Sequence, residues 1–140
     1  MNNTYDCGFL IKHIHDALQR DANNALRAKD LTISQVKVLL LLEDMPQREM
    51  SLKELERQLH VAQSTAAGIV VRLEQKGFVE ALGSAEDKRI KMVRLTDAGL
   101  ACCADSQLHM KQTEQRLLSR LTEEERILFG SLLQKVSETL

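Results

Sequence analysis

A short charged run between two strand-like segments has the chemistry to bind nucleic acid. The run is Asp87-Lys88-Arg89, and the segments are 78–82 and 90–95. A guanidinium group pairs with phosphate oxygens and also suits the narrow, electronegative minor groove of a duplex. A neighbouring carboxylate can hold the arginine stem or cap the turn. The run therefore predicts the basic tip of a β-hairpin.

A second group of candidate residues opens a helix predicted over 63–76. A tight connection, His60-Val61-Ala62, joins this helix to an earlier short one, and two helices joined in this way form a helix-turn-helix unit. The helix is roughly 20 Å long at 1.5 Å per residue, so its first turns can lie against base edges in a major groove. The positions facing outward at its start are Gln63, Ser64, Thr65, Ala67 and Gly68.

Helical periodicity and capping signals outline the elements that hold these residues. Apolar side chains repeat every three or four positions over about 6–29, and capping-box pairs at Thr32/Gln35 and Ser51/Glu54 open the next two helices. Met45-Pro46 marks the end of the second helix.

Two further helices are predicted after the hairpin. Thr96 is a plausible N-cap for a helix over about 97–121, and Thr122 with Glu125 opens the last helix. The long helices at both ends carry more apolar surface than a small core needs, which favours a dimer.

Three segments give the chain a family resemblance. Leu73-Glu-Gln-Lys-Gly77-Phe-Val-Glu80, Asp87-Lys-Arg89 and Leu95-Thr-Asp-Ala-Gly99 read as a helix ending at a left-handed glycine, a wing tip and a new helix start. This arrangement resembles the winged-helix domain of the MarR family of bacterial transcriptional regulators, and the likeness extends from about Phe9 to Val136.

The resemblance implies a mainly α fold with a small β-wing (α+β). It places an N-terminal dimerisation helix at 1–30, a winged helix-turn-helix at 31–95 and C-terminal dimerisation helices at 96–140, in one integrated domain. It also implies a homodimer that binds a pseudo-palindromic operator in double-stranded DNA, with half-sites about one helical turn apart. Release by a small molecule, often an aromatic acid, is common in the family.

Individual positions both match the family and depart from it. Asp87 and Arg89 match the wing tip, Ser64 and Thr65 match hydroxyl positions, and Arg72 lies where a basic residue near the DNA backbone is frequent. Ala62 replaces the usual capping serine, and Ala67-Gly68 replaces larger polar side chains. The small pair either allows close approach to thymine methyl groups or simply permits tight packing.

Composition is consistent with a single globular domain. The chain has 140 residues, 44% of them apolar, and a net charge of −1. Basic residues outnumber acidic ones by two between Glu86 and Arg94, so one face suits DNA despite the overall balance. No apolar run is long enough for a membrane span and no signal peptide is evident, so we expect no membrane partner and a cytoplasmic location.

Catalytic, metal and cofactor sites are not expected. No nucleophile–base pair, metal cluster or phosphate-binding glycine loop has suitable spacing. His13 and His15 lie on different faces of a helix, which argues against a shared zinc ion.

The cysteines and the fold leave two alternatives open. Cys7, Cys102 and Cys103 are expected to be reduced. Cys7 lies near a helix start, where a thiol can be activated, although Asp6 opposes thiolate formation; a thiol-based redox regulator is one alternative. The other is a winged helix that binds only proteins. The operator, the regulated genes, the effector and the direction of regulation are not encoded in recognisable motifs.

Overall fold

The computed structural model describes residues 6–140, so the first five residues of the segment predicted at 1–30 lie outside the described part. The chain divides into two units, one ending at Ser106 and the other comprising Gln107–Leu140. The elements in chain order are α1 (Cys7–Arg27), α2 (Ile33–Glu43), a short 3-10 turn η1 (Pro46–Arg48), β1 (Glu49–Ser51), α3 (Leu52–Leu59), α4 (Gln63–Gln75), β2 (Val79–Gly83), β3 (Lys91–Leu95), α5 (Asp97–Leu117) and α6 (Glu123–Ser137).

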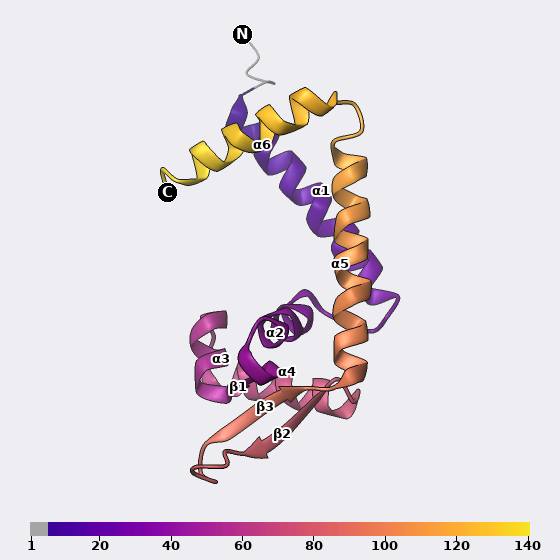
Figure 1. Ribbon diagram of the computed structural model, residues 1–140. Coiled ribbons are helices and arrows are strands. Elements are labelled where there is room, and N and C mark those ends of the chain that lie inside the picture. Colours follow the sequence, from indigo (N-terminus) through magenta and orange to yellow (C-terminus); the bar gives the residue numbers. More distant parts are fainter. Residues whose placement is uncertain (1–5) are drawn as a thin grey trace. The chain divides into compact units, whose positions relative to one another are not determined.

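The β structure is larger than the predicted two-stranded wing. Three antiparallel strands lie in the order β1-β3-β2 (Figure 1), with Val93 of β3 paired to Met50 on one side and Ala81 on the other. The added strand β1 is only three residues long, and it forms because β3, forty residues later in the chain, supplies its hydrogen-bonding partner. The mainly α fold with a small β-wing is confirmed.

The core of the first unit lies between the sheet and the helices α2, α3 and α4. Helix α2 is buried on more than one side, because Val38, Leu39 and Leu42 are all fully buried. The sequence spacing predicts that Val36, Leu39 and Leu40 point one way, but Leu40 is only partly buried, at the edge of this core. The other large side chains that are fully buried come from α3, α4, the sheet and α5: Leu55, Val70, Leu73, Val79, Val93 and Cys103.

The predicted caps form with one difference. Thr32 with Gln35 and Thr122 with Glu125 each make both hydrogen bonds of a capping box. Ser51 Oγ accepts the backbone N–H of Glu54 at 3.1 Å, but the Glu54 carboxylate binds Arg57 and Gln58 instead of returning to the cap. Hydrogen bonding to Arg57 lowers the pKa of Glu54.

The passage from α4 into the wing and on into α5 follows the sequence prediction. Gly77 has a φ of 78°, the left-handed conformation that ends α4 and turns the chain into β2. Thr96 Oγ1 accepts the N–H of Gly99 at 3.1 Å and donates to the carbonyl of Gly77 at 2.6 Å. Thr96 thus caps α5 and ties its start to the end of α4.

The second unit consists of the later part of α5 and α6. Helix α5 ends four residues before the predicted position 121, and the intervening residues lead to the Thr122 cap. Every residue of α6 is described and none is buried; apart from the half-buried Phe129, its large apolar side chains are exposed, with Ile127 at 71% and Leu132 at 50%. Among the described residues, no helix is long and apolar enough to cross a membrane.

Candidate nucleic-acid interface

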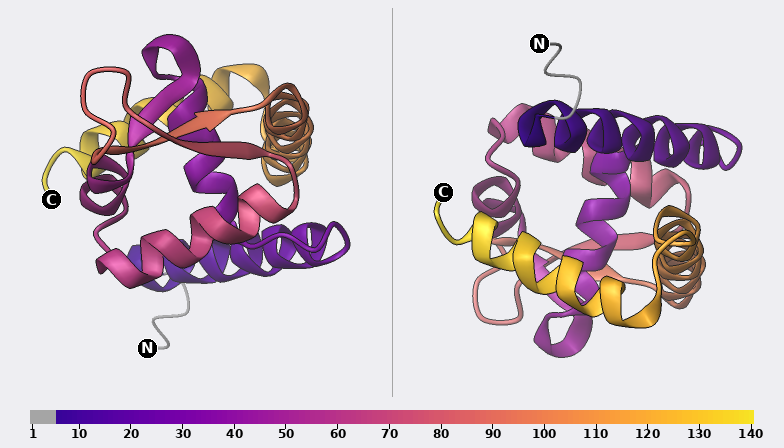
Figure 2. Two further views of the ribbon diagram at one scale, coloured as in Figure 1. Left: turned by 90° about the horizontal axis from the view of Figure 1, so that it is seen from below. Right: turned by 90° about the horizontal axis from the view of Figure 1, so that it is seen from above.

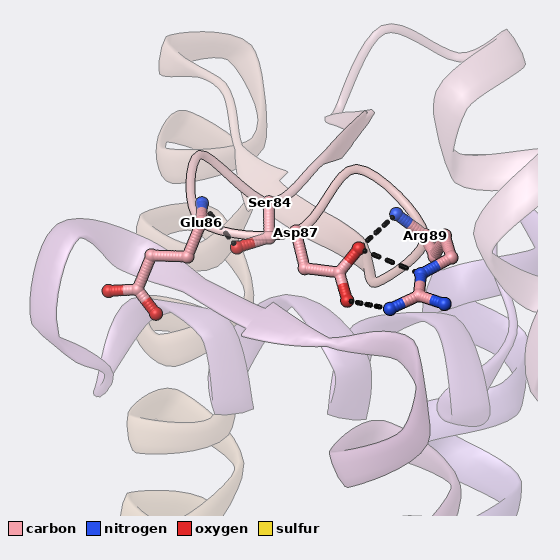
Figure 3. Close-up of polar contacts among 4 residues, drawn as sticks. All are labelled: Ser84, Glu86, Asp87 and Arg89. Atoms are coloured by element: carbon pink, nitrogen blue, oxygen red, sulfur yellow. Dashed lines mark hydrogen bonds and ion pairs between the residues drawn. The ribbon is translucent and has the colours of Figure 1, made fainter.

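The tip of the wing holds Arg89 in a fixed orientation. Asp87 accepts three hydrogen bonds from Arg89, one from its backbone N–H at 2.9 Å and two from its guanidinium at 3.2 and 3.1 Å (Figure 3). The Arg89 side chain is nevertheless 90% exposed. The hydrogen bonds from the Arg89 side chain, followed by the one from its backbone, lower the pKa of the Asp87 carboxyl. The carboxylate both shapes the turn and aims the guanidinium, the two roles that the sequence suggested.

The loop that carries this pair is closed by backbone and side-chain contacts. Ser84 N–H donates to the carbonyl of Ile90 at 2.8 Å, and Ile90 N–H donates to the carbonyl of Asp87 at 3.0 Å. Ser84 Oγ accepts the N–H of Glu86 at 3.3 Å. In Figure 1 the loop between β2 and β3 projects beyond the helices of its unit, so its tip is accessible to a large partner.

The basic residues of the wing differ in how available they are. Lys88 and Lys91 are exposed, like Arg89. Arg94 donates to Glu49 Oε2 at 2.7 and 3.0 Å, which joins β3 to β1. Arg94 was counted among the basic residues of the wing, but its charge is neutralised within the sheet, and the accessible cations gather toward the tip.

Helix α4 exposes the predicted positions at its N-terminal end. Gln63, Ser64, Thr65 and Gly68 are exposed and Ala67 is half-buried. Ala62 is the N-cap and makes no side-chain hydrogen bond there. Thr65 N–H donates to the carbonyl of Ala62, so the N–H groups of Gln63 and Ser64 are the ones that can meet a phosphate oxygen.

The outward face of α4 continues beyond the residues that the sequence singled out. Ser64, Gly68, Val71 and Gln75 are spaced by four, three and four residues, so they form one stripe along the helix. Arg72 is exposed beside this stripe, and Val71 is 43% exposed. The burial of Ala66, Val70 and Leu73 on the opposite side identifies this face. Applied to the whole helix, the same periodicity would have indicated Val71 and Gln75.

A groove of about 650 Å³ lies beside the C-terminal end of α4. Lys76 spans one edge of it, where its ammonium group donates to the carbonyl of Asp30 and lies 3.4 Å from Asp30 Oδ2. Figure 2 shows α1 and α4 overlapping when viewed from below and from above, and the lining residues place the C-terminal ends of the two helices at this groove. The lining residues come from α1, α2 and α4 and from the residues that follow α1 and α4: Asn23, Arg27, Asp30, Leu31, Thr32, Gln35, Arg72, Gln75 and Lys76.

The thiols lie in different surroundings. Cys103 is buried, and this burial raises the pKa of its thiol to about 11. Burial also raises the pKa of Cys102. Cys7 is exposed at the first position of α1, where Asp6 Oδ1 already accepts the N–H groups of Gly8 and Phe9. Redox sensing through Cys7 stays a prediction, whereas Cys103 has the properties of an inert apolar filler.

The histidines do not gather around a common point. His13 stacks on Phe9 with ring centroids 6.4 Å apart, and His15 lies within 3.4 Å of Gln19. Across residues 6–140, no group of three or more His, Cys, Asp or Glu side chains is placed to hold a metal ion.

Comparison with known proteins gives one consistent family. The model of the MarR family matches residues 31–91. The multiple antibiotic resistance protein MarR of Escherichia coli K12 is 32% identical over 136 residues, which cover 96% of this chain and 93% of that protein. The apo crystal structure of E. coli MarR has a TM-score of 0.79 over 93% of this chain and 95% of that one.

One further relative and one further structure of the same fold carry functional descriptions of their own. The HTH-type transcriptional repressor IacR of Pseudomonas putida is 26% identical over 94% of this chain and 78% of that protein. A structure of BpsR from Bordetella bronchiseptica, whose DNA binding is regulated by 6-hydroxynicotinic acid, has a TM-score of 0.72 at 23% identity over 98% of this chain and 96% of that one.

Proposed function

The chain belongs to the MarR family of transcriptional regulators, and on that premise we propose that it represses transcription as a homodimer bound to a pseudo-palindromic operator and is released by a small aromatic acid. Proteins of this family are DNA-binding regulators rather than enzymes. In the proposed complex, α4 lies in the major groove and the wing reaches the adjacent minor groove. The proposed DNA-contacting residues are Gln63, Ser64, Thr65, Ala67, Gly68, Arg72, Asp87, Lys88 and Arg89.

One observation supports this mode of binding most directly. The outward face of α4 and the Asp87–Arg89 pair belong to one unit and are separated by a short path through Gly77 and β2. A helix that reads base edges and an exposed, oriented guanidinium are therefore carried on one folded body. A module that binds only proteins has no need of this pairing.

The proposal is tested with DNA that flanks the gene of this protein. An electrophoretic mobility shift in excess nonspecific competitor should retain a retarded band, and footprinting should show two protected half-sites about one helical turn apart, roughly 34 Å. Protection of one asymmetric half-site, or binding abolished equally by any competitor, would contradict it.

The homodimer is supported by apolar side chains that the fold leaves uncovered. In α1, Phe9 is 55% exposed and Ile11 48%, and no residue of α6 is buried. Large apolar side chains gathered on one helix in this way mark interaction sites in soluble proteins. Repression is the direction suggested by the description of IacR.

The groove beside α4 supports release by a small acid. Its volume of about 650 Å³ lies in the range of ligand pockets, and Arg27 and Arg72 supply positive charge around it, while Lys76 is paired with Asp30. BpsR, which shares the fold, is regulated by an aromatic acid. A ligand held here would contact the end of the same helix that faces DNA.

A substitution in the groove can distinguish ligand binding from DNA binding. Arg27→Ala should leave operator affinity unchanged and raise the concentration of aromatic acid needed for release, measured by fluorescence anisotropy of a labelled operator. Arg20→Ala, an exposed position on α1 outside the groove, is the matched control. Identical release curves for the two variants would remove the groove from the proposal.

A further inference from the structure

One side chain crosses directly from α4 to the wing. Glu74 Oε2, on the last turn of α4, accepts the backbone N–H of Ala81 in β2 at 3.1 Å. Glu74 lies on the flank of α4, between the buried side that carries Leu73 and the outward face that carries Gln75. The contact therefore joins the two proposed DNA-binding elements without belonging to either contact surface.

The backbone group that Glu74 binds has no partner within the sheet. Strand β2 is an edge strand in the order β1-β3-β2, so one row of its N–H groups faces away from β3. Ala81 pairs in register with Val93, but its N–H turns outward to the carboxylate of Glu74. Glu74 thus attaches the free edge of the wing to α4.

Because this contact lies well away from the wing tip, a small rotation at the contact would displace the tip by a larger distance. Ala81 is the central residue of β2, and Asp87 lies six positions further along the chain, up to about 20 Å away at 3.3 Å per residue. A rotation of about 10° at Ala81 would move the tip by roughly 3 Å, the length of a hydrogen bond. A guanidinium that must enter a narrow minor groove does not tolerate such a displacement.

We propose that Glu74 is a positioning residue that fixes the angle between α4 and the wing, and thereby the separation between the major-groove and minor-groove contacts of each half-site. This inference rests on the proposed function, because it concerns how the two contacts are spaced on one duplex.

The direction in which DNA affinity changes when Glu74 is substituted distinguishes a positioning role from a simple effect of its negative charge. Glu74 carries a negative charge near the proposed DNA surface, so electrostatics alone would make its removal tighten binding to phosphates. Loss of a positioning contact would weaken binding. Glu74→Gln removes the charge but keeps an oxygen acceptor for Ala81, whereas Glu74→Ala removes both.

The experiment measures affinity for the operator by fluorescence anisotropy in each Glu74 variant, with and without Arg89→Ala. Glu74→Gln and the control Glu80→Gln, an equal charge change on the exposed side of β2, should bind at least as tightly as the unmodified chain. Glu74→Ala should bind about threefold to tenfold more weakly. In the Glu74→Ala background, Arg89→Ala should have a smaller effect than in the unmodified chain, because the tip is already displaced.

A second variant and a measurement without DNA distinguish loss of the Glu74–Ala81 contact from misfolding of the Glu74→Ala variant. Glu74→Asp keeps the charge but shortens the reach, so it should bind more weakly than the unmodified chain. The Ala81 amide should exchange its hydrogen slowly in the unmodified chain and in Glu74→Gln, and faster in Glu74→Ala and Glu74→Asp.

The outcomes distinguish this inference from the proposed function. Equal affinity of Glu74→Ala and Glu74→Gln, or strictly additive effects with Arg89→Ala, would overturn the positioning role while leaving sequence-specific DNA binding intact. An unmodified chain with no preference for the operator would overturn both.

Discussion

Arg89 and Asp87 show how a single residue pair prepares a surface for a partner. The guanidinium is almost fully exposed, yet three hydrogen bonds to Asp87 restrict its conformations before any duplex arrives. A group that is already ordered loses less conformational entropy when it binds. Because the folded-state pKa of Asp87 is lowered from 3.8, the pair is present above that pH and is lost only as the pH falls through the lowered value.

Arg89→Ala is expected to weaken binding to specific and nonspecific duplexes by similar factors, since in the proposed complex the guanidinium would contact the groove and backbone without reading one base. The slope of log affinity against log salt concentration should become shallower by about 0.9, the contribution of one released counterion. Titrations between about 50 and 200 mM salt would measure this change. Unchanged affinity at every salt concentration would remove Arg89 from the interface.

The thiol of Cys103 should be unreactive in the folded protein. A thiol with a pKa of about 11 is about one-thousandth ionised at pH 8, and this side chain is also buried. A short iodoacetamide pulse at pH 8, followed by peptide mass spectrometry, should find Cys103 unlabelled until denaturant is added. Labelling of Cys103 under native conditions would show that α5 opens locally.

At the level of elements, Gly99 permits the close approach of α5 to the wing. A Cβ atom at this position would lie 2.2 Å from the carbonyl oxygen of Phe78 and 2.6 Å from a methyl group of Leu95. Gly99→Ala should destabilise the fold by about 1–3 kcal/mol, because backbone must move to relieve the overlap. Urea unfolding would measure the loss.

Gly130→Ala is the matched control for that substitution. Gly130 lies inside α6, where an added Cβ meets no atom within 4 Å. Alanine there should be neutral or stabilise the helix by up to about 1 kcal/mol. If both alanine variants unfold at the same urea concentration, the predicted overlap at position 99 does not reduce the stability of the fold.

Elements with local signals could be predicted from the sequence, and those that depend on distant partners could not. The caps at Thr32 and Thr122 and the left-handed Gly77 are determined by neighbouring residues, so their prediction is confirmed. Strand β1 has only three residues and depends on a partner far along the chain. The sequence predicted too late an end for α5, because apolar residues near 118–121 continue the helical periodicity after the helix has ended.

The candidate interface was predictable to a similar extent. The Asp87–Arg89 contact joins residues two apart in the chain, so the sequence could indicate it. The pairing of Arg94 with Glu49 and the contact of Glu74 with Ala81 depend on tertiary packing. Sequence spacing alone therefore overcounted the available cations and missed the attachment of the wing.

At the scale of the whole molecule, the exposed apolar side chains should cause the protein to form a dimer, which can be detected from its mass in solution. Sedimentation equilibrium should give twice the 15.8 kDa of one chain. Leu132→Glu, on an exposed apolar position of α6, should shift the protein toward monomer and weaken operator binding by at least about tenfold, because two linked half-sites bind more tightly than one. Ser131→Glu, exposed on the same helix, is the control. A chain that is monomeric without any substitution would contradict the homodimer.

Arg72 and Lys76 belong both to the lining of the groove and to the end of α4. A ligand in the groove and a duplex on α4 would thus act on one helix, and their binding free energies would be coupled. Thermodynamic reciprocity then requires that the factor by which the ligand weakens operator binding equals the factor by which the operator weakens ligand binding. Unbound protein would take up the ligand first, and among several promoters those with the tightest operators would be the last to be induced as the ligand accumulates.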